Sequence, residues 1–95
     1  MTQSKGSVFD PMEELSRSEA RVVVKLEFRR FRKPVTIIEG ISDSRLRNIA
    51  RDLKRRFGAG GSVKGMEILI QGDRREHVRE ELVRLGFAED HIVLI

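Results

Sequence analysis

The sequence feature that most constrains the fold is a pair of strand-like runs on either side of a short basic stretch. The first run alternates apolar and other residues, as is typical of a half-buried strand. Its alternating apolar set is Val22, Val24, Leu26 and Phe28. Residues 35–39 form a second run, rich in β-branched side chains. Pro34 lacks a backbone donor and belongs at a turn or strand start. The two runs predict a β-hairpin with residues 29–34 at its tip.

Two helices are predicted downstream of this hairpin, each with one apolar face. In the first, apolar residues recur at helical spacing, and Gly58 can supply the left-handed residue that ends a helix, so we expect a helix over about 44–57. The second is predicted to follow a capping box, in which the side chains of Asp73 and Glu76 satisfy the first backbone donors. This second helix is expected to end at Gly86.

Three more strand-like segments complete the pattern, at residues 62–64, 66–71 and 91–95. Because each helix has one apolar face, a sheet is the surface that can cover both. The sequence therefore predicts an α+β fold, a two-layer sandwich with the order β-β-α-β-β-α-β and two helices on one side of a five-stranded mixed sheet. The opposite face of the sheet is expected to be the more exposed one.

Residues 1–20 are expected to form a flexible N-terminal tail, because they are polar and lack sustained periodicity. The predicted folded domain covers residues 21–95. No apolar run approaches the ~20 residues that a membrane span needs, and the N-terminus has no apolar signal-peptide core. We therefore expect a cytoplasmic protein that is monomeric and has no membrane partner.

The sequence gives little support for a catalytic or metal centre. Cysteine is absent, and the two histidines, His77 and His91, fall on different predicted elements without accompanying carboxylates. No serine lies in a nucleophile elbow. The glycine-rich stretch 58–65 places its serine before its lysine and leads into a strand, whereas a phosphate-binding P-loop ends in Gly-Lys-Ser/Thr at a helix start. We predict no enzymatic activity, no cofactor and no metal.

The positive charge is concentrated in the middle of the chain. Residues 29–64 contain eleven Lys and Arg against three Asp and Glu, a net charge of +8, while the whole chain has a net charge of +4. A clustered basic field favours a polyanionic partner such as nucleic acid, with a solvated surface as the alternative. Four of these cations lie at the hairpin tip, where little carboxylate is available to neutralise them. Four more lie on the outer face of the first predicted helix.

These basic residues form the core of a candidate RNA-binding set. Most are arginines, whose planar guanidinium binds phosphate through two N–H groups and can also stack on bases. Phe31, between the tip cations, would either stack on a base or fold back onto the sheet edge. Because the paired aromatics of an RRM are not evident, docking onto folded RNA by shape and phosphate is favoured. The candidates are Arg29, Arg30, Phe31, Arg32, Lys33, Arg47, Arg51, Lys54, Arg55 and Lys64.

Four segments together resemble translation initiation factor 1 of archaea and eukaryotes, the archaeal form more closely. They are residues 29–40 (RRFRKPVTIIEG), 60–64 (GGSVK), 67–74 (EILIQGDR) and 82–87 (LVRLGF), in this order and spacing. The resemblance covers the whole predicted domain. It implies a five-stranded sheet with two helices on one side and a protein that is not an enzyme.

The resemblance also implies a partner and a role. Members of this family bind the small ribosomal subunit and its rRNA near the decoding site, where they help to reject wrong start codons. Initiator tRNA, mRNA and other initiation factors would be indirect partners. The hairpin tip and the first helix would lie against rRNA, and a further segment is associated with start-site fidelity: Gln71, Gly72, Asp73 and Arg74. The alternative is a generic structured-RNA-binding module of the same fold, because fold alone does not settle function.

Overall fold

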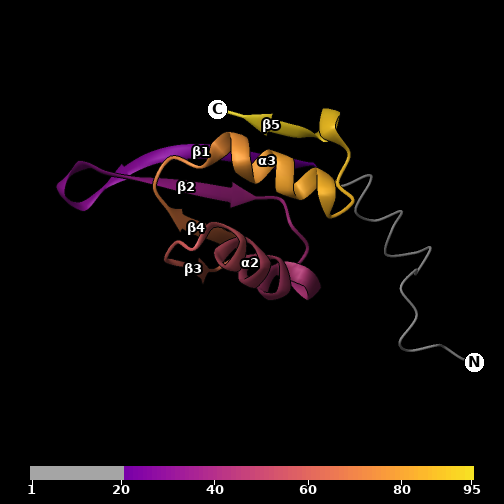
Figure 1. Ribbon diagram of the computed structural model, residues 1–95, viewed down its shortest axis with the longest axis horizontal. Helices are drawn as coiled ribbons and strands as arrows, with labels where there is room; N and C mark the ends of the chain where they lie inside the picture. The colour runs from indigo at the N-terminus through magenta and orange to yellow at the C-terminus, as the bar shows by residue number, and fades with distance from the viewer. Residues whose placement is uncertain (1–20) are drawn as a thin grey trace, which may run out of the picture.

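The chain folds as a two-layer α+β sandwich (Figure 1). The computed structural model describes residues 21–95, and the predicted flexible tail at residues 1–20 lies outside the described residues. The regular elements, in chain order, are β1 (Val22–Arg29), β2 (Lys33–Glu39), α2 (Asp43–Phe57), β3 (Gly61–Lys64), β4 (Glu67–Gln71), α3 (Arg75–Arg84) and β5 (Ile92–Leu94). Short 3-10 turns precede β2 and β5, at Arg30–Arg32 and Glu89–His91. The order β-β-α-β-β-α-β is the predicted one.

The five strands form one mixed sheet in the order β3-β4-β2-β1-β5. β1 pairs with β5 in parallel, whereas the other three neighbouring pairs are antiparallel. Both helices lie on the same side of the sheet (Figure 1). The predicted fold class is therefore confirmed.

The hydrophobic core fills the space between the sheet and the two helices. Alternate residues of the strands point into it and meet the apolar faces of both helices. Phe87 is buried in the same cluster just after α3, and its backbone N–H donates to the carbonyl of Leu82 at 3.0 Å. The side chains of the core with no exposed surface are Val22, Val24, Ile38, Leu53, Ile68, Ile70, Val78 and Leu82.

The tip of the β-hairpin is tighter than the sequence predicts. Pairing continues to the last residue of β1 and the first of β2, so that only Arg30–Arg32 form the turn. The N–H of Lys33 donates to the carbonyl of Arg30, and Phe31 and Arg32 have φ angles of 57° and 60°. Positive φ in a hairpin turn matches the twist of the strands, but it costs a non-glycine residue roughly 1–2 kcal/mol. The predicted six-residue tip is thus a short turn with a strained backbone.

β1 and β2 extend beyond the rest of the sheet as a two-stranded arm, which we define as residues 27–35. The ladder between them has seven residue pairs, but β4 pairs with β2 only at 36–38 and β5 pairs with β1 only at 22–24. Within the described chain, one isolated bridge between Val35 and Gly72 is the only further pairing of the arm. Figure 1 shows the arm projecting past both helices.

Phe28 lies on this arm and outside the core, which corrects the sequence prediction. Alternation along β1 places Phe28 on the same face as Val22 and Val24, which are fully buried, but its own side chain is 66% exposed. The reason is length, because β1 runs past the layer of helices that covers its first residues. Alternation identifies the face of a strand but not how far that face is covered.

A buried carboxylate links the two helices. Glu81 of α3 is 4% exposed and accepts a hydrogen bond from Nε of Arg84 at 3.0 Å. Nε of Arg56, from α2, lies 3.4 Å from the other carboxylate oxygen. The hydrogen bond from Arg84 lowers the pKa of Glu81, although burial alone would raise it. Glu81 is therefore ionised and holds a guanidinium from each helix.

We expect Glu81→Gln to lower the free energy of unfolding at neutral pH by about 1–2 kcal/mol, because the amide removes the buried negative charge that both guanidinium groups share. The native pKa lies below the ordinary glutamate value of 4.5. The stabilisation is therefore complete above that value and is lost as the pH falls through the native pKa. Urea unfolding of wild type and variant should differ at neutral pH and converge in acid.

The matched control is Glu80→Gln, at an exposed neighbour on α3 that has no ion pair with any described residue. It should change stability little at either pH. An equal loss of stability in the two variants would contradict the bridging role of Glu81.

Candidate nucleic-acid interface

The tip of the arm carries three cations without a counter-charge. Arg30, Arg32 and Lys33 are exposed, and none makes a side-chain hydrogen bond or ion pair with a described residue. Arg29 differs, because its Nε and Nη2 donate to Oε1 of Glu27 at 3.2 and 2.9 Å. The expectation that little carboxylate neutralises the tip is therefore wrong for Arg29 and confirmed for the other three.

An open hollow of about 880 Å³ lies between the arm and the edge strand β3. Arg29, Arg30 and Lys33 line it from the arm, and Lys64 lines it from β3. No carboxylate is among the described residues around it. The hollow thus brings together four of the ten candidate RNA-binding residues from two parts of the sequence.

The hollow opens on the sheet face that the helices leave uncovered. Val35 and Leu69 contribute to its lining, and Leu69 alternates along β4 with Ile68 and Ile70, which are fully buried in the core. Backbone of Gly61 and Gly72 also lies along it. A concave surface edged by cations is a shape that can follow a polyanionic backbone.

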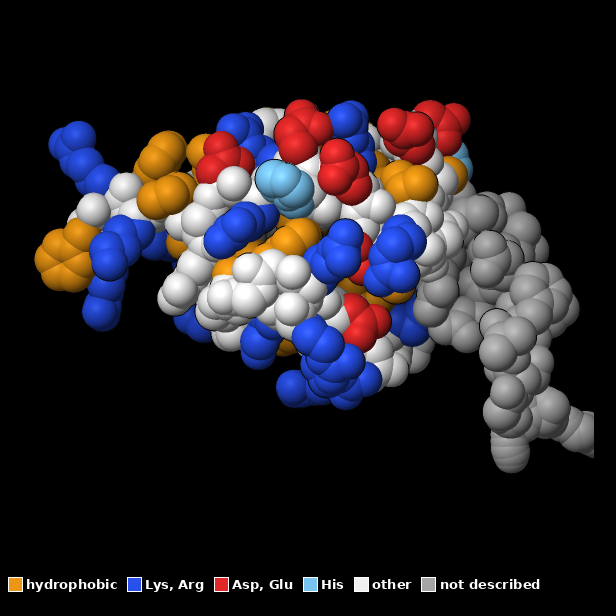
Figure 2. Space-filling view, in the orientation of Figure 1, with side chains coloured by type: hydrophobic (Ala, Val, Ile, Leu, Met, Phe, Trp, Pro, Cys, Tyr) orange, Lys and Arg blue, Asp and Glu red, His pale blue; other side chains and the backbone are white. Residues whose placement is uncertain are grey.

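The second basic surface follows the outer side of α2. Arg47, Arg51 and Arg55 are exposed and recur every four residues, so they form one row along the helix. Arg51 donates to the amide oxygen of the asparagine one turn earlier, at 3.1 Å, and this neutral partner leaves its charge uncompensated. Lys54 is half-buried, with its stem beside Gly61 of β3. Figure 2 shows basic side chains gathered over α2 and, separately, on the arm.

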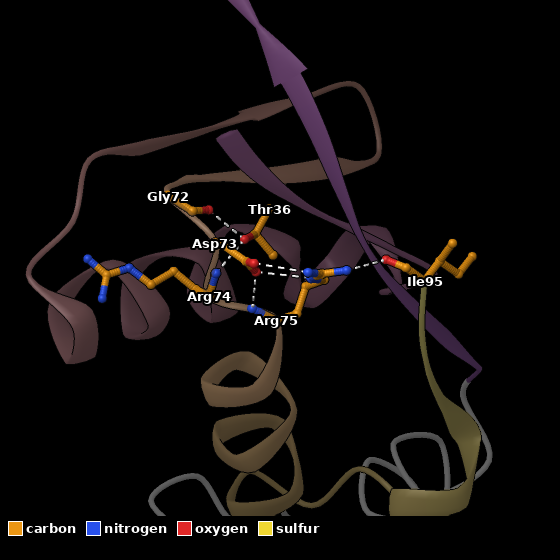
Figure 3. Close-up of polar contacts among 6 residues, drawn as sticks. All are labelled: Thr36, Gly72, Asp73, Arg74, Arg75 and Ile95. Carbon is orange, nitrogen blue, oxygen red and sulfur yellow. Dashed lines mark hydrogen bonds and ion pairs between the residues drawn. The ribbon is translucent and has the colours of Figure 1, made fainter. Parts of the chain in front are cut away.

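A buried threonine ties the segment 71–74 to the base of the arm (Figure 3). Thr36 is fully buried, and its Oγ1 donates to the carbonyl of Gly72 at 2.7 Å and accepts the N–H of Arg74 at 2.8 Å. The N–H of Gly72 donates to the carbonyl of Pro34 at 2.9 Å, and its φ of 92° favours glycine. Sequence reasoning missed Thr36. Its one signal was a hydroxyl within an otherwise apolar β-run.

The predicted capping box at the start of α3 is wrong. The carboxylate of Asp73 pairs with the guanidinium of Arg75 at 2.9 Å and also accepts the backbone N–H of Arg75 at 3.4 Å, not that of Glu76. Glu76 pairs with Arg79 at 2.7 Å, so the reciprocal box does not form. The two-point, charge-assisted bond from the guanidinium of Arg75 is the main cause of a lowered pKa of Asp73, and the backbone N–H of Arg75 lowers that pKa further. Arg75 also donates to the carbonyl of Ile95 at 2.9 Å, which joins this segment to the C-terminal strand (Figure 3).

The four fidelity-associated candidates therefore face different surroundings. Gln71 and Gly72 line the hollow beside the arm. Asp73 is engaged on the side of the C-terminal strand, and the side chain of Arg74 points away from it (Figure 3). Only the first two share a surface with the cations of the arm.

Two further kinds of site are absent from residues 21–95. No group of three or more His, Cys, Asp or Glu side chains in this range could hold a metal ion. No helix within it is long and apolar enough to cross a membrane.

Comparison with known proteins gives one consistent family. The family model described as translation initiation factor SUI1 matches residues 18–88. A protein translation factor SUI1 homolog from Sulfolobus acidocaldarius is 44% identical over 88 residues, which cover 90% of this chain and 89% of that protein. Homologs of the same name from Sulfurisphaera tokodaii and Methanocaldococcus jannaschii are 46% and 43% identical over 85 and 82 residues. These cover 87% and 84% of this chain, and 85% and 80% of the respective proteins.

We expect Thr36→Val to destabilise the protein by about 1–3 kcal/mol, because the isosteric methyl leaves the N–H of Arg74 and the carbonyl of Gly72 without their partner. Urea unfolding measures the loss. Hydrogen exchange of the Arg74 amide provides the local readout, and it should quicken in the valine variant. Thr36→Ser keeps the hydroxyl and should leave that exchange rate near wild type. An unchanged exchange rate of the Arg74 amide in the valine variant would contradict the proposed role of the Thr36 hydroxyl.

Proposed function

The chain belongs to the translation initiation factor SUI1 family, and we propose that it binds the small ribosomal subunit near the decoding site. There it promotes accurate selection of the start codon. SUI1 translation factors are not an enzyme family, so the proposed mechanism is one of binding and release. The observation that carries the proposal is the group of uncompensated cations on the arm and around the hollow beside it, namely Arg30, Arg32, Lys33 and Lys64.

Ribosomal RNA is the polyanion that these cations would bind. A guanidinium presents a planar fork of donors to phosphate, and Arg30 is available for such a bond because no described carboxylate competes for it. Lys33 and Lys64 border the hollow from two different strands, so a phosphate backbone lying in it would be contacted from both sides. Each neutralised phosphate releases condensed counterions, which makes the affinity depend on salt.

The two basic surfaces give the factor two points of attachment on rRNA. Folded RNA is recognised largely by its shape and by phosphates at fixed positions. The arm supplies one set of contacts and the row of arginines on α2 supplies another, and the packed core keeps their relative placement constant. The factor is thereby oriented on the subunit without reading a sequence. Contacts made by solvent-exposed side chains also release readily, which suits a mechanism of binding and release.

The segment 71–74 is where we place the coupling to start-site fidelity. Thr36 bonds both Gly72 and Arg74 at the base of the arm, and Gln71 faces the hollow. Contact of the arm with the subunit would be transmitted to this segment through the same hydrogen bonds. Initiator tRNA, mRNA and other initiation factors are then indirect partners, sensed through the subunit, and the factor acts as a cytoplasmic monomer.

Arg30→Ala is expected to weaken binding to purified small ribosomal subunits and to reduce the slope of log affinity against log salt by about 1, because one phosphate contact is lost. Arg79→Ala removes the same charge from α3, where Arg79 pairs with Glu76, and this matched control should bind as wild type. Co-sedimentation over a range of salt concentrations measures both. Thermal unfolding should show little change in either variant, because both arginines lie at the surface.

Competition with unrelated structured RNA separates this function from that of a generic RNA-binding module. Unrelated structured RNA and added free subunits are compared as competitors. If the RNA displaces the protein from subunits at the same concentration as the free subunits do, the generic module is the better description. If wild-type protein fails to sediment with small subunits even at low salt, the initiation role is overturned.

A further inference from the structure

The arm exposes two phenylalanines, whereas the other described phenylalanines are at least partly buried. Phe31 is 87% exposed and Phe28 is 66% exposed. Phe87 lies in the core and Phe57 packs against it. Two exposed aromatic rings within four residues, on a segment that projects from the body, indicate a surface that binds a partner.

The backbone of the turn keeps the ring of Phe31 in solvent. Phe31 has φ and ψ of 57° and 29°, and the next residue, Arg32, also has positive φ. Bulky residues avoid this region, and a strained conformation at an exposed turn is typical of a functional constraint. The hydrogen bond from the N–H of Lys33 to the carbonyl of Arg30 closes the turn. The ring does not fold back onto the sheet edge, which was the alternative that the sequence left open.

Phe28 is held in a different way, by the strand ladder of the arm. It pairs across the hairpin with Pro34, on the face that α3 covers farther along β1. The rings are therefore presented from a paired strand and from a closed turn of one hairpin, and neither depends on a loose loop. Figure 2 shows hydrophobic and basic side chains gathered together on this arm.

The charges around the two rings decide which partner they fit. Arg30, Arg32 and Lys33 have no counter-charge in the described chain, and the nearby carboxylate of Glu27 is already bound by Arg29. Docking against a neutral protein surface would take these cations out of water without pairing them, which is unfavourable. Single-stranded RNA offers a base to each ring and a phosphate to each cation.

We propose that Phe28 and Phe31 form a stacking platform for unpaired bases, so that the arm selects single-stranded or bulged nucleotides of RNA over fully paired helices. The proposal rests on the proposed binding to rRNA and deepens it by naming the form of RNA that the arm contacts. Bases inside an A-form helix stack on one another and do not offer their faces to a protein ring. Because every base has a π-face, the platform adds affinity without reading sequence.

The test uses the full chain and two model RNAs of equal length, one with a large unpaired loop and one fully paired. Wild type should prefer the looped RNA. Phe28→Ala and Phe31→Ala should each lower affinity for it roughly tenfold, while the affinity for paired RNA and the slope against salt stay unchanged. Phe31→Trp keeps a ring and should keep the preference. Arg30→Ala should instead lower both affinities and the salt slope.

Equal affinity of wild type for the two RNAs would overturn the platform, as would an unchanged affinity of the Phe28→Ala/Phe31→Ala double variant for the looped RNA. Thermal unfolding checks that this variant is folded, as expected for two exposed positions.

Binding to small ribosomal subunits provides the separate readout. If wild type binds subunits and the double variant binds equally well, the platform alone fails. If wild type does not bind subunits, the proposed function fails whatever the model RNAs show. The double variant could also lose subunit binding while it binds the looped RNA as tightly as wild type does. That result would indicate that the rings contact a protein, and it would also overturn the platform.

Discussion

The long antiparallel ladder between β1 and β2 is the constraint on which the rest of the structure depends. Its seven residue pairs form the centre of the sheet at one end and the arm at the other. The core is built only where β4, β5 and both helices accompany the ladder. A two-stranded hairpin is marginally stable alone in water, so the arm is ordered because its base is part of that core. Candidate contacts on the arm can therefore vary without disturbing the side chains that hold the fold.

The distribution of carboxylates separates structural cations from those available to a partner. Ion pairs to Asp or Glu engage Lys25, Arg29, Arg56, Arg75, Arg79 and Arg84. The exposed cations with no such partner in the described chain are Arg21, Arg30, Arg32, Lys33, Arg47, Arg51, Arg55 and Lys64. Most of the second group falls on the arm, on β3 and on the row along α2. The net charge of the chain alone does not reveal this division, because it sums both groups.

Much of the fold could be predicted because its signals act over a few residues. Alternation, helical spacing and terminal glycines predicted all seven regular elements in order, and charge clustering selected the candidate RNA-binding residues. Local signals cannot show how far a layer of helices extends over a strand, or which of several partners a side chain bonds. They do not show that the helices stop short of Phe28, that Asp73 bonds Arg75 and not Glu76, or that Thr36 bonds a distant loop. The pairing of Arg29 with Glu27 was accessible, since residues two apart share one face of a strand.

The turn of the arm violates a local rule that the rest of the chain obeys. The other described residues with positive φ are glycines, whereas the turn uses Phe31 and Arg32. A glycine would relieve the strain, but it would remove a side chain and widen the range of backbone conformations. With Phe31 and Arg32 at these positions, the turn keeps a ring and a cation on a backbone of one conformation. Less conformational freedom is then lost on binding. Local violations of this kind are expected where binding, and not stability, selects the residue.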